Sequence, residues 1–234
     1  MKIVWCFLVV FMAELREINV LYEDNHLLVV EKPINMPVCE DESRDKDLLS
    51  VLKDYIKKKY NKPGDVYLGL VHRLDRPVGG VMVFARTSKA AARLSKQVME
   101  RELDKIYLAV VCGKVDEEGE FFDYLVKDKK KNMSYVTDKI HGKEARLRYK
   151  RLAYKDGFSL VEVHLETGRS HQIRVQFSSR GVPLVGDARY NKNHDGKTNI
   201  ALFARCLSFK HPVSKETLTF ELEMPNRYPF SLFR

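Results

Sequence analysis

A polar segment enclosed by apolar ones constrains this chain more than any other feature. Residues 67–71 and 81–85 are apolar runs that predict buried strands, and residues 72–80 (HRLDRPVGG) join them. Charged side chains here must lie at the strand ends or be paired, because burial of an unpaired charge is costly. A proline and two glycines give the segment an unusual backbone. We therefore expect a rigid loop that presents Asp75 between two arginines, either for chemistry or in a structural ion pair. For an isolated triplet of this kind the ion pair is the commoner outcome.

Apolar runs predict strands along much of the remaining chain. Besides the two that flank the polar segment, strands are expected at 18–22, 27–31 and 106–111, and a hairpin of 145–149 with 158–165 is expected across 155–157. Residues 48–60 place apolar side chains on one helical face and lysines on the other, and Thr87 or Ser88 is suited to cap a second helix. Strand clusters with only a few helices predict an α+β fold with a mixed, largely antiparallel sheet flanked by those helices.

The composition is that of a globular protein with an anionic partner. Of 234 residues, 44% are hydrophobic and 31% are charged, which excludes a disordered chain. The formal net charge is +9 and the pI is about 9.3. Because the cations recur throughout the chain, we expect a basic surface for nucleic acid and no membrane partner, with a merely soluble basic protein as the alternative. The run Lys127–Lys131 is expected to be a solvated polar loop.

The four cysteines predict neither a disulfide framework nor a metal site. They form no C-x-x-C pair and have no histidine at zinc spacing. A chain of this length also needs no disulfide or metal for stability. We therefore expect reduced thiols in a cytoplasmic protein and no bound metal.

The first residues need a separate interpretation. Ile3–Ala13 is an apolar run that resembles the core of a signal peptide, but it is too short to span a bilayer and no clear cleavage signal follows it. A start at Met12 explains the run better than a strand or cap packed on the core. We expect residues 1–13 to be an apolar extension and residues 14–234 to form one domain, since no repeat or linker interrupts them.

Residues 165–175 (LETGRSHQIRV) form a second polar segment. We expect a helix over residues 170–180, with Ser170 as its N-cap and Gly181 at the C′ position, and a strand as the alternative. The N–H groups at the helix start, together with two arginines and a histidine, would favour phosphate or carboxylate. Taken alone, the segment predicts either an anion-binding loop or an ordinary polar helix start, and it is not a nucleotide P-loop.

Four blocks of the chain follow one another in an order that a known enzyme family shares. They are Tyr22–Asp24 with Val29–Pro33, Leu70–Asp75 with Gly79–Arg86, Lys105–Gly113, and Thr167–Val175 with Gly181–Tyr190. These blocks resemble the catalytic domain of the RluA-type RNA pseudouridine synthases and cover most of residues 20–190. One departure is Gly79, where relatives commonly carry a serine.

The resemblance implies a reaction and its central residues. Members of this family isomerise uridine in RNA: the C1′–N1 bond breaks, the uracil turns, and C5 joins C1′ without a cofactor or metal. Asp75 would be the essential carboxylate, which attacks C1′ or removes a proton from C2′ and is ionised in either role. Arg174 would pair with this carboxylate, and Tyr107 would stack on the target uracil. The substrate would be rRNA, tRNA or both.

Further site residues are expected to contact RNA or to support the loops. Arg73 would hold the opened RNA or form an ion pair at the edge of the sheet. His72 would contact phosphate or, preferably, support its loop, and Arg169 and Gln172 would contact phosphate or loop atoms. The resemblance thus predicts an RNA-binding, cytoplasmic bacterial enzyme, expected to be a monomer.

Two other classes of function compete with the enzyme. A catalytically idle RNA-binding or ribosome-assembly factor on the same fold would be indicated by eroded motifs, whereas Asp75, Tyr107 and Arg174 are all present. A glycosidase would need a second carboxylate about 5–10 Å from the first, and none adjoins Asp75 in sequence. The pseudouridine synthase is therefore the preferred prediction.

Overall fold

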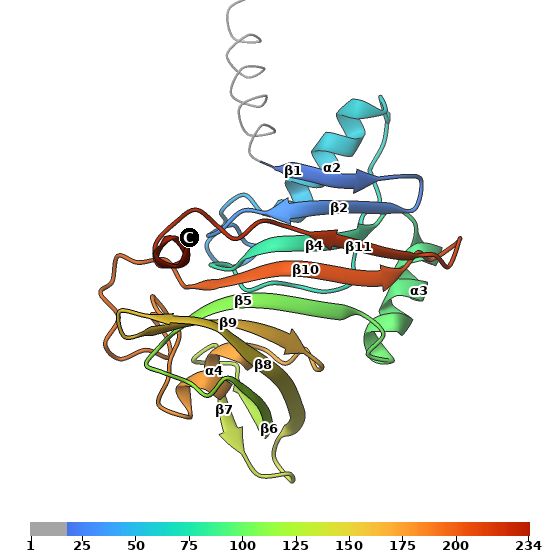
Figure 1. Cartoon of the computed structure of the whole chain (residues 1–234). Coiled ribbons are helices and arrows are strands. Elements are labelled where there is room, and N and C mark those ends of the chain that lie inside the picture. Colours follow the sequence, from blue (N-terminus) through green and yellow to red (C-terminus); the bar gives the residue numbers. More distant parts are fainter. Residues whose placement is uncertain (1–17) are drawn as a thin grey trace, which may run out of the picture. The chain divides into compact units, whose positions relative to one another are not determined.

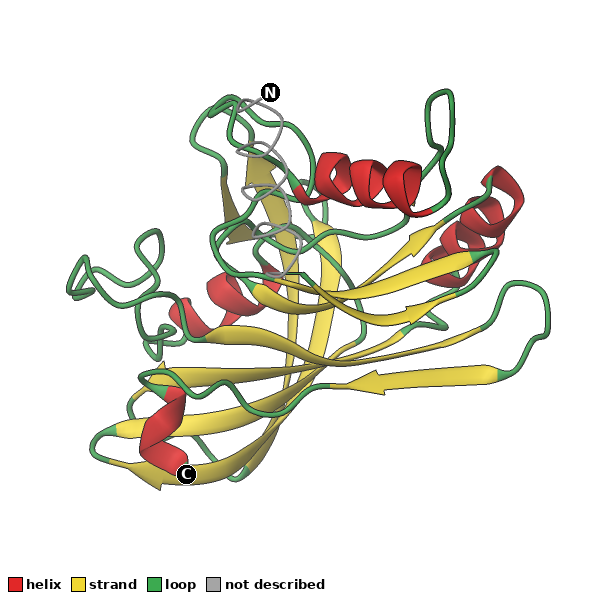
Figure 2. Cartoon of the chain, turned by 90° about the horizontal axis from the view of Figure 1, so that it is seen from above, coloured by secondary structure: helices red, strands yellow, loops and turns green. Residues whose placement is uncertain are grey.

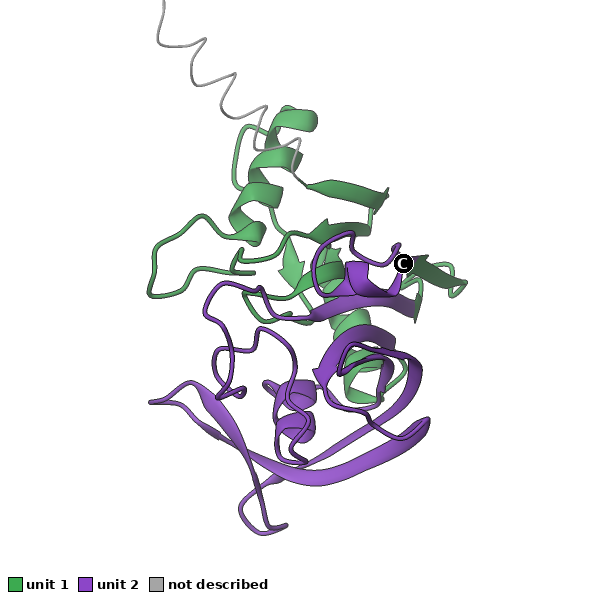
Figure 3. Ribbon diagram, turned by 60° about the vertical axis from the view of Figure 1, so that its left-hand side comes forward, with its two compact units in different colours: residues 1–102, 209–220 green, residues 103–208, 221–234 purple. Residues whose placement is uncertain are grey.

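The computed structural model describes residues 18–234, so the prediction for residues 1–13 lies outside the described residues. The described residues divide into two compact units: residues 18–102 with 209–220, and residues 103–208 with 221–234 (Figure 3). Strands predominate and helices are few (Figure 2), which confirms the predicted α+β class with a mixed, largely antiparallel sheet. The single domain over 14–234 stays a prediction. Between residues 18 and 234, no helix is long and apolar enough to cross a bilayer.

The first unit is built on short antiparallel strands, of which β2 and β4 are the most deeply buried. β1 (Asn19–Glu23) pairs with β2 (Leu27–Lys32), and β2 pairs with β4 (Gly79–Ala85) (Figure 1). The two-residue β3 (Gly69–Leu70) also pairs with β4. All seven residues of β4 are buried, as expected for a continuous apolar run covered on both faces. The predicted strands are confirmed within one or two residues, except that the strand expected at 67–71 is reduced to β3.

Two helices of the first unit begin at residues whose side chains cap them. The Asp47 carboxylate accepts a hydrogen bond from Ser50 N–H at the start of α2 (Leu48–Lys59), 3.0 Å away. The Thr87 hydroxyl accepts one from Ala90 N–H at the start of α3 (Ser88–Met99), 3.1 Å away. Each bond satisfies an N–H group that has no partner inside its helix. Both helices were predicted, and Thr87 is the cap of the two candidates.

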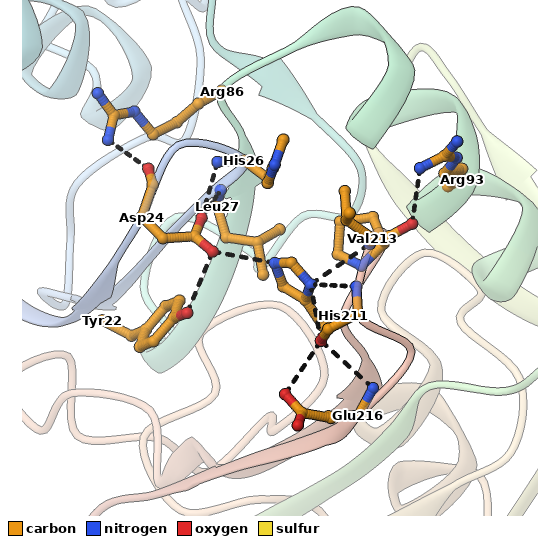
Figure 4. A network of polar contacts seen from close by, with 11 residues as sticks. Tyr22, Asp24, His26, Leu27, Arg86, Arg93, His211, Val213 and Glu216 are labelled. Carbon is orange, nitrogen blue, oxygen red and sulfur yellow. Dashed lines mark hydrogen bonds and ion pairs between the residues drawn. The ribbon is translucent and has the colours of Figure 1, made fainter.

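The turn between β1 and β2 is fixed by one carboxylate (Figure 4). Asp24 Oδ1 accepts hydrogen bonds from His26 N–H and Leu27 N–H, both at 2.7 Å. Its Oδ2 lies 3.1 Å from the Tyr22 hydroxyl and 2.9 Å from His211 Nε2. Burial raises the pKa of Asp24, but the two backbone N–H donors and the side-chain partners outweigh it, so the net shift is downward. His211 precedes β11 (Thr217–Glu221), so this carboxylate joins distant parts of the first unit.

The second unit is an antiparallel sheet of long strands. Its order is β10-β5-β9-β8-β6-β7. The strands are β5 (Asp104–Cys112), β6 (Glu118–Asp128), β7 (Met133–Thr137), β8 (Lys143–Lys155), β9 (Phe158–Leu165) and β10 (Leu202–Lys210), the last of which enters the first unit at Phe209. The predicted hairpin is confirmed as β8–β9. It turns through Asp156 and Gly157, which both have positive φ (53° and 81°), as a two-residue type I′ turn requires.

Helix α4 (Gln172–Ser178) covers one face of this second sheet. Phe177 on the helix makes ring contacts with Phe121 on β6 and Tyr149 on β8, with centroids 5.0 and 5.4 Å apart. At the β5–β10 end of the unit, a separate cluster that includes Leu108, Phe203 and Phe230 is formed with the C-terminal 3-10 turn η1 (Phe230–Phe233). Burial of apolar side chains in such clusters supplies most of the favourable free energy of folding.

Three local predictions for the second unit were wrong or only partly right. The helix expected over 170–180 exists but begins at Gln172, and its N-cap is His171 in the left-handed conformation (φ 55°), not Ser170. Gly181 does have positive φ (76°), yet it follows the C-cap Ser179 by two residues and not by one. The run Lys127–Lys131 is only partly a loop, because β6 continues to Asp128 before the turn.

Candidate active site

Asp75 lies on a short turn between β3 and β4 of the first unit. The Asp75 carbonyl accepts a hydrogen bond from Val78 N–H at 3.0 Å, which closes the turn. Leu74 and Val78 on either side are buried (8% and 1% exposed), so they hold the turn against the core while Asp75 itself is half-buried. Buried apolar neighbours and a closed turn fix the position of the carboxylate, which is what a catalytic group needs.

A buried lysine stabilises this turn through hydrogen bonds to its backbone. Lys32, the last residue of β2, is 1% exposed, and its Nζ donates to the carbonyls of Pro33 (2.9 Å), Arg76 (2.9 Å) and Val78 (2.8 Å). Burial lowers the pKa of Lys32 to about 7, while the charge of Asp75 opposes that shift. Two of the three acceptors, Arg76 and Val78, lie within three residues after Asp75, so the ammonium determines the path of the backbone there.

His72 and Arg73 have different surroundings in the same loop. His72 Nε2 accepts a hydrogen bond from Val83 N–H on β4 at 3.1 Å, so the ring supports the loop, as preferred from the sequence. Arg73 is exposed. Contact of either residue with RNA stays a prediction.

Arg76, next to Asp75, is held by the segment that connects β2 to α2. Its Nε donates to the Asn35 carbonyl (3.2 Å) and its Nη1 to the Ser43 hydroxyl (2.9 Å). Its Nη2 forms an ion pair with Asp45, and Asp41 Oδ2 lies 3.6 Å from Nη1. Of the two arginines near Asp75, Arg76 is therefore the one that is bound to an acidic segment.

Arg174 forms a buried ion pair in the second unit. It is 4% exposed, and its Nε and Nη2 donate to the two oxygens of Asp187 at 2.8 and 2.7 Å. Asp187 is fully buried, and its Oδ1 also accepts from the backbone N–H groups of Arg189 (3.0 Å) and Tyr190 (3.2 Å). A two-point arginine–carboxylate pair fixes the plane of the guanidinium. The observed partner of Arg174 is thus Asp187, and the pairing of Arg174 with Asp75 stays a prediction.

Gln172 and Arg169 contact their own loop. Gln172 is 3% exposed: its Oε1 accepts from the Thr167 hydroxyl (2.8 Å) and Arg169 N–H (3.0 Å), and its Nε2 donates to the Arg146 carbonyl (3.0 Å). Arg169 Nε donates to the Glu144 carbonyl at 2.7 Å. These bonds tie the segment before α4 to β8, which is one of the two roles expected for both residues. A phosphate contact by either residue remains untested.

Tyr107 lies on the face of the second sheet that α4 covers. It is 7% exposed on β5 and pairs with Val163 on β9, which pairs in turn with Tyr149 on β8. Directly paired residues of neighbouring strands point to the same face, and Tyr149 contacts Phe177 of α4. The fold thus brings Tyr107 and the helix of Arg174 to one face of this unit.

Sequence reasoning missed two residues that position the site. Lys32 has no predicted role beyond its place in the block Val29–Pro33, although the apolar residues before it on the same strand indicate an interior position. Asp187 has no predicted role either, because nothing in its local sequence distinguishes this carboxylate from exposed ones. Within the described residues, no group of histidine, cysteine, aspartate or glutamate is arranged to hold a metal ion.

The family model described as RNA pseudouridylate synthase matches residues 26–179. Curated relatives include ribosomal large subunit pseudouridine synthase D of Zymomonas mobilis, 34% identical over 89% of this chain and 69% of its own length. The protein of the same name from Neisseria meningitidis serogroup B is 34% identical over 92% of this chain and 60% of its own length. An uncharacterized RNA pseudouridine synthase of Aquifex aeolicus is 33% identical over 90% of this chain and 71% of its own length.

A solved structure agrees in fold. The human RNA pseudouridylate synthase domain containing 4 superposes with a TM-score of 0.78, covering 96% of this chain and 95% of that one at 23% identity. That match concerns the fold, whereas the family model spans Asp75, Tyr107 and Arg174. The residues that the family model matches, together with the identity to curated relatives over about two thirds of their length, establish that the chain belongs to the RNA pseudouridine synthase family, a family of isomerases.

Proposed function

We propose that this chain isomerises specific uridines in RNA to pseudouridine, with Asp75 as the essential carboxylate. The observation that carries the proposal is the anchored turn of Asp75 inside the matched residues: a closed backbone turn, buried neighbours and a buried lysine hold one half-buried carboxylate in place. Such preorganisation is expected of a group that must meet one atom of a ribose.

Asp75 acts in its ionised form in either chemical route. As a nucleophile it attacks C1′ while the C1′–N1 bond breaks, and as a base it removes the C2′ proton to leave a glycal. The uracil then turns and C5 bonds to C1′, while the bond from Asp75 to C1′ breaks in the first route and C2′ regains its proton in the second. C5 loses its proton and N1 gains one. The reaction is an isomerisation, so the atoms of substrate and product balance without a co-reactant.

The other proposed site residues serve the RNA. Tyr107 stacks on the target uracil, for which a flat ring held in a sheet is suited. Arg174 pairs with the Asp75 carboxylate and orients it, a role that is supported by the guanidinium plane, which Asp187 fixes. An enzyme that acts on a base in RNA must take it out of the stack, and this costs free energy. Arg73, which is exposed, contacts the RNA and stabilises this opened state. Arg169, His72 and Gln172 complete the predicted set.

Ribosomal large-subunit RNA is the substrate that we propose first, and tRNA second. The support is that the curated relatives from Zymomonas and Neisseria are named ribosomal large subunit pseudouridine synthases. The positive charge of the chain (+9) suits any RNA and does not choose between them. We further propose action in the cytoplasm, where such RNA is found.

The test compares Asp75→Asn with a matched control, Asp65→Asn, an exposed aspartate of the same unit. RNA from a strain that lacks the gene is incubated with each protein, and pseudouridines are mapped by chemical modification and sequencing. Wild type and Asp65→Asn should restore the same positions, whereas Asp75→Asn should restore none and still bind RNA. Turnover by Asp75→Asn would refute the site assignment, and a deletion strain with no missing pseudouridine would favour the idle RNA-binding factor instead.

A further inference from the structure

The segment between β2 and α2 carries charge of the wrong sign for an RNA-binding protein. Residues 40–46 (EDESRDK) hold four carboxylates and two cations in a chain whose net charge is +9. Two of these carboxylates, Asp41 and Asp45, surround the guanidinium of Arg76, the residue after Asp75. An RNA phosphate that approaches Asp75 therefore meets an arginine already occupied by carboxylates.

The contacts of Arg76 are exposed and therefore exchangeable. The side chains of Arg76, Asp41 and Asp45 are 40%, 41% and 54% exposed. Ion pairs in this range of exposure are weakened by salt and contribute little to stability. A phosphate, which offers the same bidentate geometry to a guanidinium, competes well for such an arginine.

The acidic segment keeps its own structure without the arginine. The Ser43 hydroxyl lies 2.6 Å from Asp41 Oδ1 and 2.9 Å from Asp45 Oδ2. Ser43 N–H donates to Asp41 Oδ1 at 3.0 Å, and Asp45 N–H donates to the Ser43 hydroxyl at 3.1 Å. Because these partners remain when Arg76 leaves, departure of the guanidinium strands no buried carboxylate.

The backbone of Arg76 stays in place when its side chain moves. Lys32 Nζ donates to the Arg76 carbonyl at 2.9 Å from a fully buried position. The guanidinium can therefore exchange partners while the Asp75 turn keeps its shape. A fixed backbone with a movable charged end is what a switchable contact requires.

We propose that Asp41, Asp45 and Arg76 form a charge latch: the two carboxylates hold Arg76 in the RNA-free protein, and an RNA phosphate displaces them and takes the guanidinium. Arg76 is then a phosphate contact beside Asp75, and the acidic segment lowers the affinity for RNA that cannot reach this arginine. The inference rests on the proposed RNA substrate but not on the chemical role of Asp75.

The first test measures how binding depends on salt. A fluorescein-labelled RNA hairpin with an all-uridine loop is titrated with the full chain at several salt concentrations. Each phosphate contact contributes about 0.7–0.9 to the slope of log affinity against log salt. Arg76→Gln should weaken binding and reduce this slope by about that amount. Lys57→Gln, which removes an exposed charge from the last turn of α2, should leave the slope unchanged.

The second test separates a latch from simple repulsion. Asp41→Asn with Asp45→Asn should tighten hairpin binding about three- to tenfold in the presence of Arg76, as expected for release of exposed ion pairs. The gain should be clearly smaller when Arg76→Gln is also present, because no latch is then left to open. Asp54→Asn with Asp65→Asn, two exposed aspartates of the same unit, serves as the matched control.

The outcomes are distinguishable from failure of the proposed function. Pseudouridine formation by the wild type is measured with cellular RNA, and circular dichroism confirms that each variant is folded. An active wild type whose salt slope is unaffected by Arg76→Gln refutes the latch alone. Equal gains from the double aspartate change with and without Arg76 also refute it, since repulsion would then explain the effect.

Discussion

Replacing Lys32 with methionine tests whether the buried ammonium stabilises the Asp75 turn. The change keeps a long, unbranched side chain but removes the donor to three carbonyls at 2.8–2.9 Å. A hydrogen bond from a charged donor contributes about 1.5–3 kcal/mol, so three amount to about 5–9 kcal/mol. Against this, lowering the pKa of Lys32 from 10.5 to about 7 corresponds to about 5 kcal/mol of cost for the charged form. The expected net loss at pH 6 is therefore about 0–4 kcal/mol.

The effect should grow with pH. Between the folded-state pKa of about 7 and the unfolded value of 10.5, the unfolded chain binds one proton more than the folded chain at Lys32. The unfolding free energy of the wild type then rises with pH, because stability increases wherever the unfolded state binds more protons. Methionine does not titrate. The gap between wild type and Lys32→Met should therefore widen by about 2 kcal/mol between pH 6 and 8.5.

Urea unfolding followed by far-ultraviolet circular dichroism at four or more pH values measures this gap. Lys57→Met, at an exposed lysine on α2, is the control and should give a curve parallel to that of the wild type. Two results would refute the reasoning: a Lys32→Met curve that is also parallel to the wild type, or a variant as stable as the wild type at pH 8.5. Either would mean that Lys32 does not hold the turn in the way that its contacts and its lowered pKa indicate.

Four further substitutions have expected effects on stability, each measured by urea unfolding. Asp24→Ala removes the acceptor of two backbone N–H groups and should cost about 2–3 kcal/mol at pH 7; because the pKa of Asp24 is lowered in the folded state, this gap should shrink as pH falls below about 4. Gly186→Ala, at φ 71° with two carbonyl oxygens 2.6 Å from the new methyl group, should cost about 2–4 kcal/mol, whereas Gly157→Ala, with open space around it, should cost only about 1 kcal/mol. Asp187→Asn leaves the buried Arg174 without its counter-charge and should cost about 3–5 kcal/mol; an unchanged midpoint would show that Arg174 does not depend on it.

The elements that the sequence predicts are those whose cause is local. β4 is a continuous apolar run, α2 has an apolar face and an aspartate at its N-cap, and the β8–β9 turn contains Asp156-Gly157. Each of these signals acts within a few residues, so its result depends little on the remainder of the chain. Asp75 could be predicted as a catalytic residue only from the four ordered blocks of the family resemblance. An isolated Arg-x-Asp triplet more often forms a structural ion pair.

What the sequence could not predict depends on contacts between distant positions. The partner of Arg174 is Asp187, and nothing local distinguishes that carboxylate from exposed ones. Lys32 was missed because lysine is almost never buried, so its type argued for exposure even where its strand position argued for the interior. His171 displaced the predicted cap Ser170, whose carbonyl accepts from the Ser134 hydroxyl of β7 at 2.7 Å; such tertiary bonds override local capping preference.

Lys32 and Arg76, two cations at the Asp75 turn, have different roles: one holds the turn in position and the other responds to RNA. Lys32 is buried and bonds only to backbone carbonyls, so it fixes where the turn runs and should affect mainly stability. Arg76 is exposed and bonds to side chains of an acidic segment, so it should affect mainly the affinity for RNA. A variant of Lys32 that altered the salt slope, or a variant of Arg76 that lowered the unfolding free energy by several kcal/mol, would contradict this division. If this division holds, Asp75 keeps one position while the nearby charge of Arg76 responds to the substrate. The two functions are separable because Lys32 sets the position and Arg76 supplies the charge.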